Sequence, residues 1–442
     1  MYRMTARDLV MAIRDRRIGV EELTREYLKR IEKYDGPAGL NTVAELNENV
    51  IEQARKMDSM KSGRSGVVFG LPMLVKDNID VCGLHTTAGS LALKDNVAVK
   101  DAHIIENLRR NGALILGKTN MTEFANYTGE NMPGGYSSRG GQVKNAYDQE
   151  KSPGGSSSGS AVAMSAGLCA GAIGTDTSFS IIGCVTENGV TGIKPAHGAL
   201  SSKGIIPISR TLDSAGPITR NLQDGLLVYS AMRDNPLQHI EPMAPEKIHL
   251  AVNTFNRDCV SKEQLARYDK VLNRLKNAGA EISEVSHAGT QYQRHIMRFE
   301  FRHDLEEYLS RSRAKRRTLK EIVDYYEANP DKMMRYGDKS LRGALEGVSG
   351  RLDDELYIEA MTERKNLQRQ IVDDLNKYDA CIMEGPTNIM HFTGLPSLAL
   401  GLCMAEDGTP RGMILYGADE QRLFSAAMTI EKYCEVKTPD CY

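Results

Sequence analysis

The spacing of apolar residues in the first sixty positions predicts three helices. Thr5 is a suitable N-cap for the segment "ARDLVMAIRDRR". The following segment, "VEELTREYLKRIEKY", repeats apolar residues at helical spacing, so one face would carry Leu23, Tyr27, Leu28 and Ile31. Residues 46–61 have a similar pattern. We therefore expect residues 1–62 to form an N-terminal helical region.

The pattern then changes to one that is typical of buried strands. The segment "VVFGLPMLVKDNIDV", residues 67–81, is apolar on both faces except at Lys76, and Pro72 interrupts it. The segment "DAHIIENLRRNGALILGKTN" predicts a helix followed by a buried strand over residues 113–117. Helices that alternate with strands in this way indicate an α/β fold.

The middle of the chain is rich in loops. Residues 128–160 carry many Gly, Ser, Asn and Pro residues. The segment "SAVAMSAGLCAGAIGTDT" then predicts a helix of small residues that leads into a short strand or turn. Residues 186–235 mix short apolar runs with turns. Together, residues 65–235 form the expected core of the protein.

Residues 290–377 are rich in charge at helical spacing, which is typical of solvated helices. We interpret them as a helical layer over the sheet without a function of its own. The segments "YDACIMEGP" and "PRGMILYG" predict strands within a closing region of strands and a helix, residues 378–435. We find no internal repeat and no long linker, so we expect a single domain over residues 1–442.

Composition and charge exclude several classes of protein. The 442 residues include 56 Lys+Arg and 58 Asp+Glu, a net charge of −2, so no nucleic-acid partner is expected. None of the eight cysteines forms a C-x-x-C pair, so neither a zinc site nor a disulfide framework is expected. The N-terminus lacks the apolar core of a signal peptide, and the small apolar run 161–173 is too short to span a bilayer. These features favour a cytoplasmic protein without a membrane partner.

Three polar features are candidates for chemistry: Lys76, the serine cluster 156–158 and Ser180. Taken singly, each has an ordinary structural explanation, as a surface lysine, a flexible loop and a capping serine. The segment "GSSSG" also matches G-x-S-x-G, with Ser157 in the middle. That hydrolase motif requires a strand directly before it, but "NAYDQEKSPG" is a polar loop. Nothing in the sequence distinguishes a histidine partner among His197, His239, His249, His287, His295, His303 and His391. No G-K-[ST] follows the glycines, so a phosphate-binding loop is also disfavoured, and we expect no cofactor and no metal.

Taken together, these features resemble the amidase signature family. The resemblance rests on "GLPMLVKDNID", "SPGGSSSGSAVAMSAGLCAGAIGTDTSFSI" and "GVTGIKPAHGALSSKGIIPISRTLDSAGPITR". It extends to "EFRHDLEEYL" and to the late segment "TGLPSLALGLCMAEDGTPRGMILYG". The loop "ENMPGGYSSRGGQVKNAY" is most similar to bacterial peptide-amidase-like members. The resemblance implies an α/β fold with a large mixed central sheet that helices cover on both faces.

The resemblance also implies a catalytic set of Ser, cis-Ser and Lys. The lysine is Lys76, the nucleophile is Ser180, and the relay is Ser156, whose preceding peptide bond is cis in the family. The backbone N–H groups of Thr177, Ser178 and Phe179 correspond to the family's oxyanion hole. In physical terms, a serine hydroxyl needs a base, and burial of Lys76 would lower its pKa enough for a neutral amine to take the proton through Ser156.

The nucleophile turn departs from the family pattern at one position. Relatives commonly have G-G-S or S-G-S, whereas this chain has Ser178–Phe179–Ser180. Phe179 still supplies a backbone N–H, but a positive φ there would strain it. We expect its ring to lie in the acyl pocket, and we name Asn131, Met132 and Phe179 as substrate-binding candidates.

Two classes of function follow from these residues. The first is a free-standing serine amidase that hydrolyses a small-molecule amide. The second is a subunit of a glutaminase-type amidotransferase, or a degenerate family member in which Phe179 has closed the site. The segment "IIGCV" after Ser180 lacks the arginine expected in the amidotransferase. The sequence leaves open the acyl and amine parts of the substrate and whether the chain forms a homo-oligomer.

Overall fold

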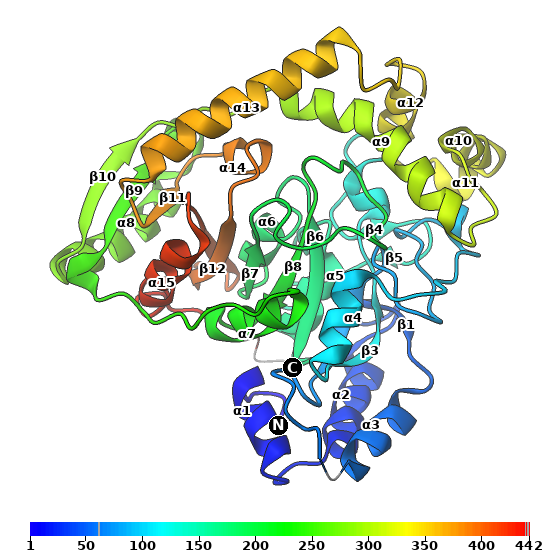
Figure 1. The fold of residues 1–442 in the computed structure, drawn as a ribbon, viewed down its shortest axis with the longest axis horizontal. Helices are drawn as coiled ribbons and strands as arrows, with labels where there is room; N and C mark the ends of the chain where they lie inside the picture. Colours follow the sequence, from blue (N-terminus) through cyan, green and yellow to red (C-terminus); the bar gives the residue numbers. More distant parts are fainter. Residues whose placement is uncertain (61, 438, 440–441) are drawn as a thin grey trace.

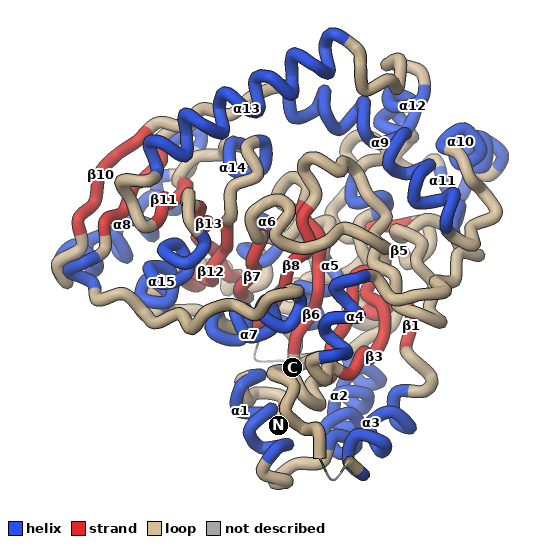
Figure 2. Tube along the Cα trace, viewed as in Figure 1, coloured by secondary structure: helices blue, strands red, loops and turns tan. Residues whose placement is uncertain are grey.

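A computed structural model of the protein describes residues 1–60, 62–437, 439 and 442. Its centre is an 11-stranded sheet with the strand order β1-β3-β2-β6-β8-β7-β12-β13-β11-β9-β10 (Figures 1 and 2). The strands are β1 (Val43–Leu46), β2 (Pro72–Lys76), β3 (Leu114–Thr119), β6 (Gly171–Asp176), β7 (Thr191–Lys194), β8 (Ser214–Thr219), β9 (His249–Asn253), β10 (Glu281–Val285), β11 (Ala380–Met383), β12 (Ser397–Met404) and β13 (Pro410–Tyr416). A separate short hairpin pairs β4 (Tyr136–Ser137) with β5 (Gly141–Gln142).

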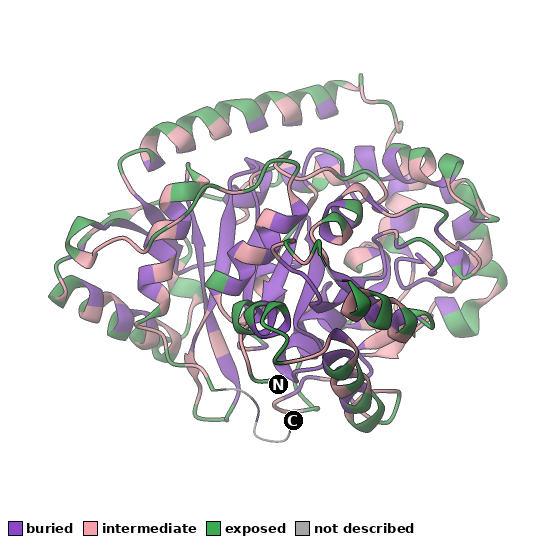
Figure 3. Cartoon of the chain, turned by 60° about the horizontal axis from the view of Figure 1, so that its bottom comes forward, coloured by how far each residue is buried: buried purple, intermediate pink, exposed green. Residues whose placement is uncertain are grey.

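The sheet is mixed, as the resemblance implies. Strand β2 runs parallel to both of its neighbours, β3 and β6, and β9 runs parallel to β10 and β11. The other pairs, in the middle and at the β1 edge, are antiparallel. Parallel strands end at the same edge of a sheet, so the residues that follow β2 and β6 are brought together. The central strands lie in the buried interior, between helices on both faces, whereas the edge strands β1 and β10 contain no buried residue (Figure 3).

The helices include the three expected near the N-terminus: α1 (Ala6–Arg14), α2 (Val20–Tyr34) and α3 (Val50–Ser59). The Thr5 hydroxyl accepts a hydrogen bond from the Asp8 amide, so the predicted N-cap of α1 is confirmed. On α2, Leu23, Tyr27 and Ile31 are buried, whereas Leu28 is only half buried. The predicted helix over 46–61 is shorter at its start because residue 46 ends β1, and position 61 lies outside the described residues.

The predicted layer over residues 290–377 is helical. It contains α9 (Tyr292–Arg311), α10 (Leu319–Ala328), α11 (Pro330–Met333), α12 (Lys339–Leu345) and α13 (Glu355–Leu375). These helices lie at the opposite end of the molecule from α1–α3 (Figure 1). Whether residues 1–442 form a single domain stays a prediction.

Several elements have no counterpart among those expected from the sequence. The segment 186–235 contains α7 (Leu222–Met232), and residues 249–285 contain β9, α8 (Lys262–Asn277) and β10. Helix α7 has apolar residues around most of its circumference and is largely buried, so it lacks the one-sided pattern of a surface helix. The remaining helices are α4 (His103–Arg110), α5 (Ser158–Ser165), α6 (Ile182–Thr186), α14 (Ile389–Phe392) and α15 (Glu420–Glu431), with short 3₁₀ turns η1 (Leu91–Leu93), η2 (Glu123–Asn126), η3 (Pro245–Lys247) and η4 (Arg257–Cys259).

Candidate active site

Lys76 is a fully buried lysine at the carboxyl end of β2. Its Nζ lies 2.8 Å from the Ser156 hydroxyl oxygen and 2.9 Å from that of Ser157. Two further contacts come from Thr175 on β6, whose hydroxyl oxygen is at 2.9 Å and whose carbonyl oxygen is at 3.1 Å. The partners are neutral oxygens, and burial lowers the pKa of Lys76 to about 7. A substantial fraction of Lys76 is therefore a neutral amine near pH 7.

The arrangement follows from the parallel pairing of β2 with β6. Val75 pairs with Ile173, and the Lys76 side chain reaches Thr175, which lies two residues further along β6. The loop that carries Ser156 and Ser157 comes from before α5 and closes over this edge. Ser157 donates its amide hydrogen to the Ser180 carbonyl (3.2 Å), and this bond connects the loop to the turn that follows β6.

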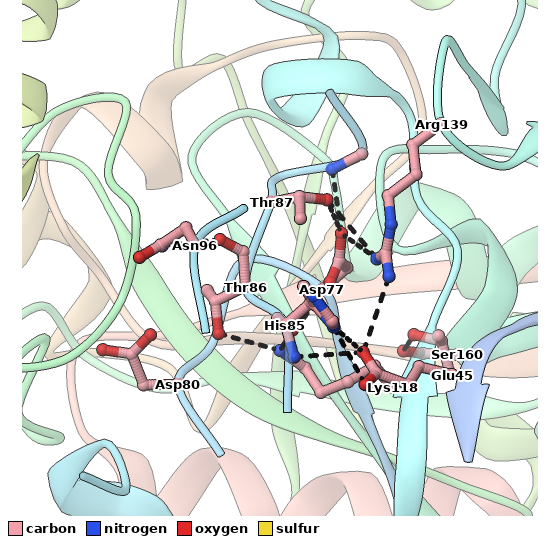
Figure 4. Close-up of polar contacts among 12 residues, drawn as sticks. Glu45, Asp77, Asp80, His85, Thr86, Thr87, Asn96, Lys118, Arg139 and Ser160 are labelled. Atoms are coloured by element: carbon pink, nitrogen blue, oxygen red, sulfur yellow. Dashed lines mark hydrogen bonds and ion pairs between the residues drawn. The ribbon is translucent and has the colours of Figure 1, made fainter. Parts of the chain in front are cut away.

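Asp77, the residue after Lys76, does not neutralise it. The Asp77 carboxylate accepts hydrogen bonds from the Thr87 hydroxyl and from the Gly89 amide at 3.1 Å. It also pairs with Arg139 at 3.2 Å and lies 3.8 Å from the buried Lys118 amine (Figure 4). Lys118 and Arg139 lie beside Asp77 and balance its negative charge. Asp77 therefore does not serve as the ion-pair partner of Lys76.

Figure 4 also shows how this charge cluster continues toward the first strand. Glu45 on β1 pairs with His85 at 3.0 Å and with Arg139 at 3.5 Å. The cluster thus connects β1, the end of β2 and the loop around Arg139. Opposite charges that are buried together stabilise one another only while all partners are present. We infer that the cluster fixes the backbone on which Lys76 stands.

The serine loop has the backbone that the resemblance implies. The peptide bond between Gly155 and Ser156 is cis, and Ser156 is 1% exposed. A side chain on Gly155 would meet the Thr122 hydroxyl at 2.6 Å, so the close packing there requires glycine. Ser157 lies in a loop rather than on a strand-to-helix elbow, and its hydroxyl donates to the Thr175 carbonyl at 3.1 Å.

Ser180 is 6% exposed and lies in the turn between β6 and α6. No hydrogen bond joins its hydroxyl to Lys76 or Ser156 in the described part of the chain. The turn is braced by Asp176, whose Oδ2 accepts the amides of Ile181 (2.6 Å) and Ile182 (3.0 Å). Burial alone would raise the pKa of Asp176, but the nearby His391 and the Ile181 amide lower it to about 2. Asp176 is therefore ionised and holds the turn in place.

Phe179 adopts a left-handed backbone conformation, with a φ of 66°. Such a conformation costs roughly 1–2 kcal/mol for a non-glycine residue. Its carbonyl accepts the amides of Gly183 (3.0 Å) and Cys184 (3.2 Å), and its ring packs against the His391 ring with centroids 4.4 Å apart. A Cβ on Gly183 would lie 2.9 Å from the Phe179 Cβ, so glycine at 183 provides the room for Phe179.

His391 contacts the backbone of this turn as well. Its Nε2 lies 2.9 Å from the Phe179 amide nitrogen and 3.0 Å from Asp176 Oδ1. No local pattern distinguishes His391 from the other histidines, because its partner Phe179 lies 212 positions earlier in the chain. Its place beside the turn, on α14, is a consequence of the tertiary fold alone.

Thr177 and Ser178 complete the turn. The Thr177 hydroxyl donates to Asp213 at 2.5 Å, and Asp213 also accepts the amides of Ile208 and Ser209. The Thr177 carbonyl accepts a hydrogen bond from Gln293 on α9 at 3.2 Å. Ser178 is exposed. The helical layer thus contacts the turn directly, through Gln293.

Asn131 and Met132 lie in the loop between η2 and β4. Asn131 is exposed with a φ of 57°, and Met132 is half buried and accepts a weak hydrogen bond from Thr128 at 3.4 Å. Their loop packs close to the serine loop, since a Cβ on Gly134 would lie 2.4 Å from the Gly154 carbonyl oxygen. No described hydrogen bond or ring contact joins Asn131 or Met132 to Lys76, Ser156 or Ser180, so their substrate-binding role stays a prediction.

A cavity of about 690 Å³ adjoins the Lys76 cluster. Thr175, Thr177, Asn78 and Asp213 line its inner part, and residues from the loops 97–101 and 200–208 and from α9 line the rest. Asn78 donates to the Thr175 hydroxyl (3.1 Å) and to the Ile206 carbonyl (3.3 Å), which fixes the orientation of its amide. The Asn78 Oδ1 is buried and has no hydrogen-bond partner among the described residues.

The fold and this site define an amidase-type protein, and the comparisons with known proteins agree. The Amidase family model matches residues 22–388, so the chain belongs to the amidase family. It is 31% identical to a probable amidase of Arabidopsis thaliana, over 98% of this chain and 91% of that protein. It is also 28% identical to a glutamyl-tRNA(Gln) amidotransferase subunit of Exiguobacterium sibiricum, over 98% of this chain and 97% of that protein.

Solved structures have the same fold. The native peptide amidase of Stenotrophomonas maltophilia superposes with a TM-score of 0.91 at 29% identity, covering 99% of this chain and 98% of that one. A glutamyl-tRNA(Gln) amidotransferase subunit of Thermotoga maritima gives 0.72 at 21% identity, over 98% of this chain and 95% of that one, and shows the likeness of fold. The protein is thus a hydrolase of amide bonds. None of the described helices combines the length and apolar character needed to cross a membrane.

Proposed function

We propose that this protein is a free-standing serine amidase that hydrolyses a small-molecule amide through an acyl-enzyme on Ser180. Ser156 serves as proton relay and Lys76 as base. The observation that carries the proposal is the contact between the buried Lys76 amine and the Ser156 hydroxyl at 2.8 Å. A lysine with a pKa of about 7 and only neutral oxygens around it is suited to accept a proton near neutral pH.

The reaction starts when the Ser180 oxygen attacks the amide carbon. The Ser180 proton passes to Ser156 while the Ser156 proton passes to Lys76, so the relay serine ends as a hydroxyl. The carbonyl π electrons move to the oxygen, and the resulting oxyanion is stabilised by the backbone N–H groups of Thr177, Ser178 and Phe179. Collapse breaks the C–N bond, and the proton returns through Ser156 to the leaving amine.

Hydrolysis of the acyl-enzyme uses the same groups. Water attacks the Ser180 ester while Lys76, again neutral, takes a proton from it through Ser156. Breakdown of the second tetrahedral intermediate returns the proton to Ser180 and releases the carboxylic acid. The Phe179 ring lies one residue from the nucleophile and narrows the space for the acyl group.

A second candidate function is that of an amidotransferase subunit. The likeness to glutamyl-tRNA(Gln) amidotransferase subunits over almost the whole chain favours it. The absence of an arginine in "IIGCV", directly after Ser180, opposes it. A protein in that role would need glutamine and protein partners, whereas an amidase would release ammonia or an amine alone. The cysteine pattern, which lacks a C-x-x-C pair, supports a cytoplasmic location.

A panel of primary and substituted amides, with glutamine among them, tests the proposal. We expect the purified chain to release ammonia or amine from some of the amides without a partner, and Ser180→Ala to release none. Hydrolysis of glutamine alone, dependent on an added partner, would establish the amidotransferase role. A protein that neither turns over any amide nor reacts with a fluorophosphonate would be the degenerate member.

A further inference from the structure

The Nε2 nitrogen of His391 lies beside a hydrogen-bond donor and a hydrogen-bond acceptor. Nε2 lies 2.9 Å from the Phe179 amide nitrogen and 3.0 Å from Asp176 Oδ1, and His391 is 1% exposed. A neutral ring nitrogen either carries a hydrogen or has a free lone pair. It therefore cannot accept from Phe179 and donate to Asp176 at the same time.

The charge of Asp176 decides between the two arrangements. Its Oδ2 already accepts the amides of Ile181 and Ile182, and Oδ1 has His391 as its neighbour. An ionised carboxylate only accepts hydrogen bonds, so a lone pair on Nε2 would face another lone pair. A hydrogen on Nε2 instead gives a charge-assisted bond to Asp176. The Phe179 N–H, which is directed at Nε2, then has no acceptor among the described residues.

We propose that His391 is a positioning residue for the nucleophile turn, which fixes the backbone of Phe179 next to the nucleophile Ser180. Asp176 holds the imidazole through Nε2–H, and the imidazole ring packs on Phe179 and supports its left-handed backbone. This inference rests on the proposed function, in which the amides of residues 177–179 bind the oxyanion.

Nitrogen NMR on the full chain tests the hydrogen position without any need for turnover. Histidine labelled with ¹⁵N gives distinct shifts for protonated and unprotonated ring nitrogens, and the signals missing in His391→Gln identify His391. We expect a hydrogen on Nε2. A lone pair on Nε2 would mean that the imidazole occupies the Phe179 N–H, and it would overturn the inference whether or not the protein is an amidase.

Kinetics of two variants test the consequence. In His391→Gln the amide nitrogen can still donate to Asp176, so we expect kcat within about fivefold of the wild type. In His391→Phe the ring is kept but the donor is lost, and we expect kcat to fall about 10²-fold with a small change in KM, as for a lost oxyanion contact. If kcat falls equally in the two variants, and both have the melting temperature of the wild type, the positioning role is contradicted. A wild type without turnover would instead contradict the proposed function.

The cavity beside Lys76 carries a second, independent inference. In the tetrahedral intermediate the leaving nitrogen must face the group that protonates it, which is the Lys76–Ser156 pair in the proposed mechanism. Thr175 contacts Lys76 and also lines the cavity, so the cavity begins on that side of the site. Asn78 lines the cavity as well, and its amide is fixed by hydrogen bonds to the Thr175 hydroxyl and the Ile206 carbonyl.

We infer that this cavity receives the amine part of the substrate, and that the substrates include secondary amides with a sizeable amine. A volume of about 690 Å³ is far larger than ammonia requires and lies within the range of small-molecule sites. The inference rests on the proposed function. It also predicts that the site restricts the size of the acyl group, at Phe179, but accepts a large amine group.

Two substrates with the same acyl group test it, one a primary amide and one an N-benzyl amide. Val99 lines the cavity and is 45% exposed, so Val99→Trp adds bulk there at little risk to folding. Met11→Trp, on the exposed face of α1, is the matched control. We expect Val99→Trp to lower kcat/KM at least about tenfold for the benzyl amide only. An unchanged ratio of the two rates in Val99→Trp and in the deeper Ala98→Trp would overturn the inference. A wild type that cleaves no amide of the panel and does not react with a fluorophosphonate would overturn the proposed function.

Discussion

The Lys76 amine and the Ser156 hydroxyl lie 2.8 Å apart in the buried interior of the protein, where β2 ends. A lysine without a carboxylate partner is unusual at such depth, because burial disfavours its charged form. The chain places the neighbouring carboxylate, Asp77, among the cations Lys118 and Arg139 instead. Lys76 is thus left with a lowered pKa and with hydroxyl partners.

The first prediction concerns pH. Lys76 acts as a base only when neutral, so activity should be present above its pKa of about 7 and should fall below it. We expect kcat/KM to drop about tenfold per pH unit on the acid side. Lys76→Arg, which stays charged, should lose at least about 10²-fold at every pH. A profile that stays flat from about pH 8 to about pH 5 would exclude Lys76 as the base.

The second prediction separates the two serines that contact Lys76. Their hydroxyl oxygens lie at 2.8 Å and 2.9 Å from Nζ, so Ser156→Ala and Ser157→Ala are matched deletions. Because the mechanism uses Ser156 as relay, we expect kcat to fall at least about 10²-fold in Ser156→Ala and less than about tenfold in Ser157→Ala. The opposite order in steady-state kinetics would move the relay to Ser157.

The third prediction concerns the acyl group. Burial of a phenylalanine ring is worth about 1.5–3 kcal/mol, so the Phe179 ring should stay packed next to the nucleophile. Small or slender acyl groups should therefore react best in the wild type. In Phe179→Gly, kcat/KM for bulky amides should rise relative to small ones. If all rates fall by the same factor, Phe179 supports the oxyanion hole and does not set acyl specificity.

The fourth prediction links Phe179 to Gly183. A methyl group at 183 would lie 2.9 Å from the Phe179 Cβ, so Gly183→Ala should destabilise the fold by about 1–3 kcal/mol in urea unfolding. In the Phe179→Gly background the clash is absent, and alanine in α6 should be neutral or stabilising. Additive effects in the double mutant would show that the two positions are independent.

Much of the alternation of helices and strands in the first part of the chain could be predicted from the sequence, because buried strands and amphipathic helices have distinct apolar spacings. Lys76 is recognisable for the same reason, since it directly follows the apolar run of residues 67–75. The sequence pattern does not predict helix α7 or strand β12, because apolar residues on all sides erase the period that distinguishes a helix from a strand.

The parts of the site that could not be predicted depend on contacts between distant segments. His391 and Gln293 come from α14 and α9, and both contact the turn of residues 177–179. Neither has a local sequence pattern that marks it. The positive φ of Phe179 could be stated only as a condition, because Gly183, Cys184 and His391 determine it together.

The most direct test of the central claim is the site of covalent labelling by a fluorophosphonate. A nucleophilic serine with an activated hydroxyl should form a stable adduct, which peptide mass spectrometry locates to a single residue. We predict an adduct on Ser180 in the wild type and none in Ser180→Ala, which should keep the melting temperature of the wild type and lose turnover. An adduct on Ser157, or full turnover by Ser180→Ala, would contradict the account.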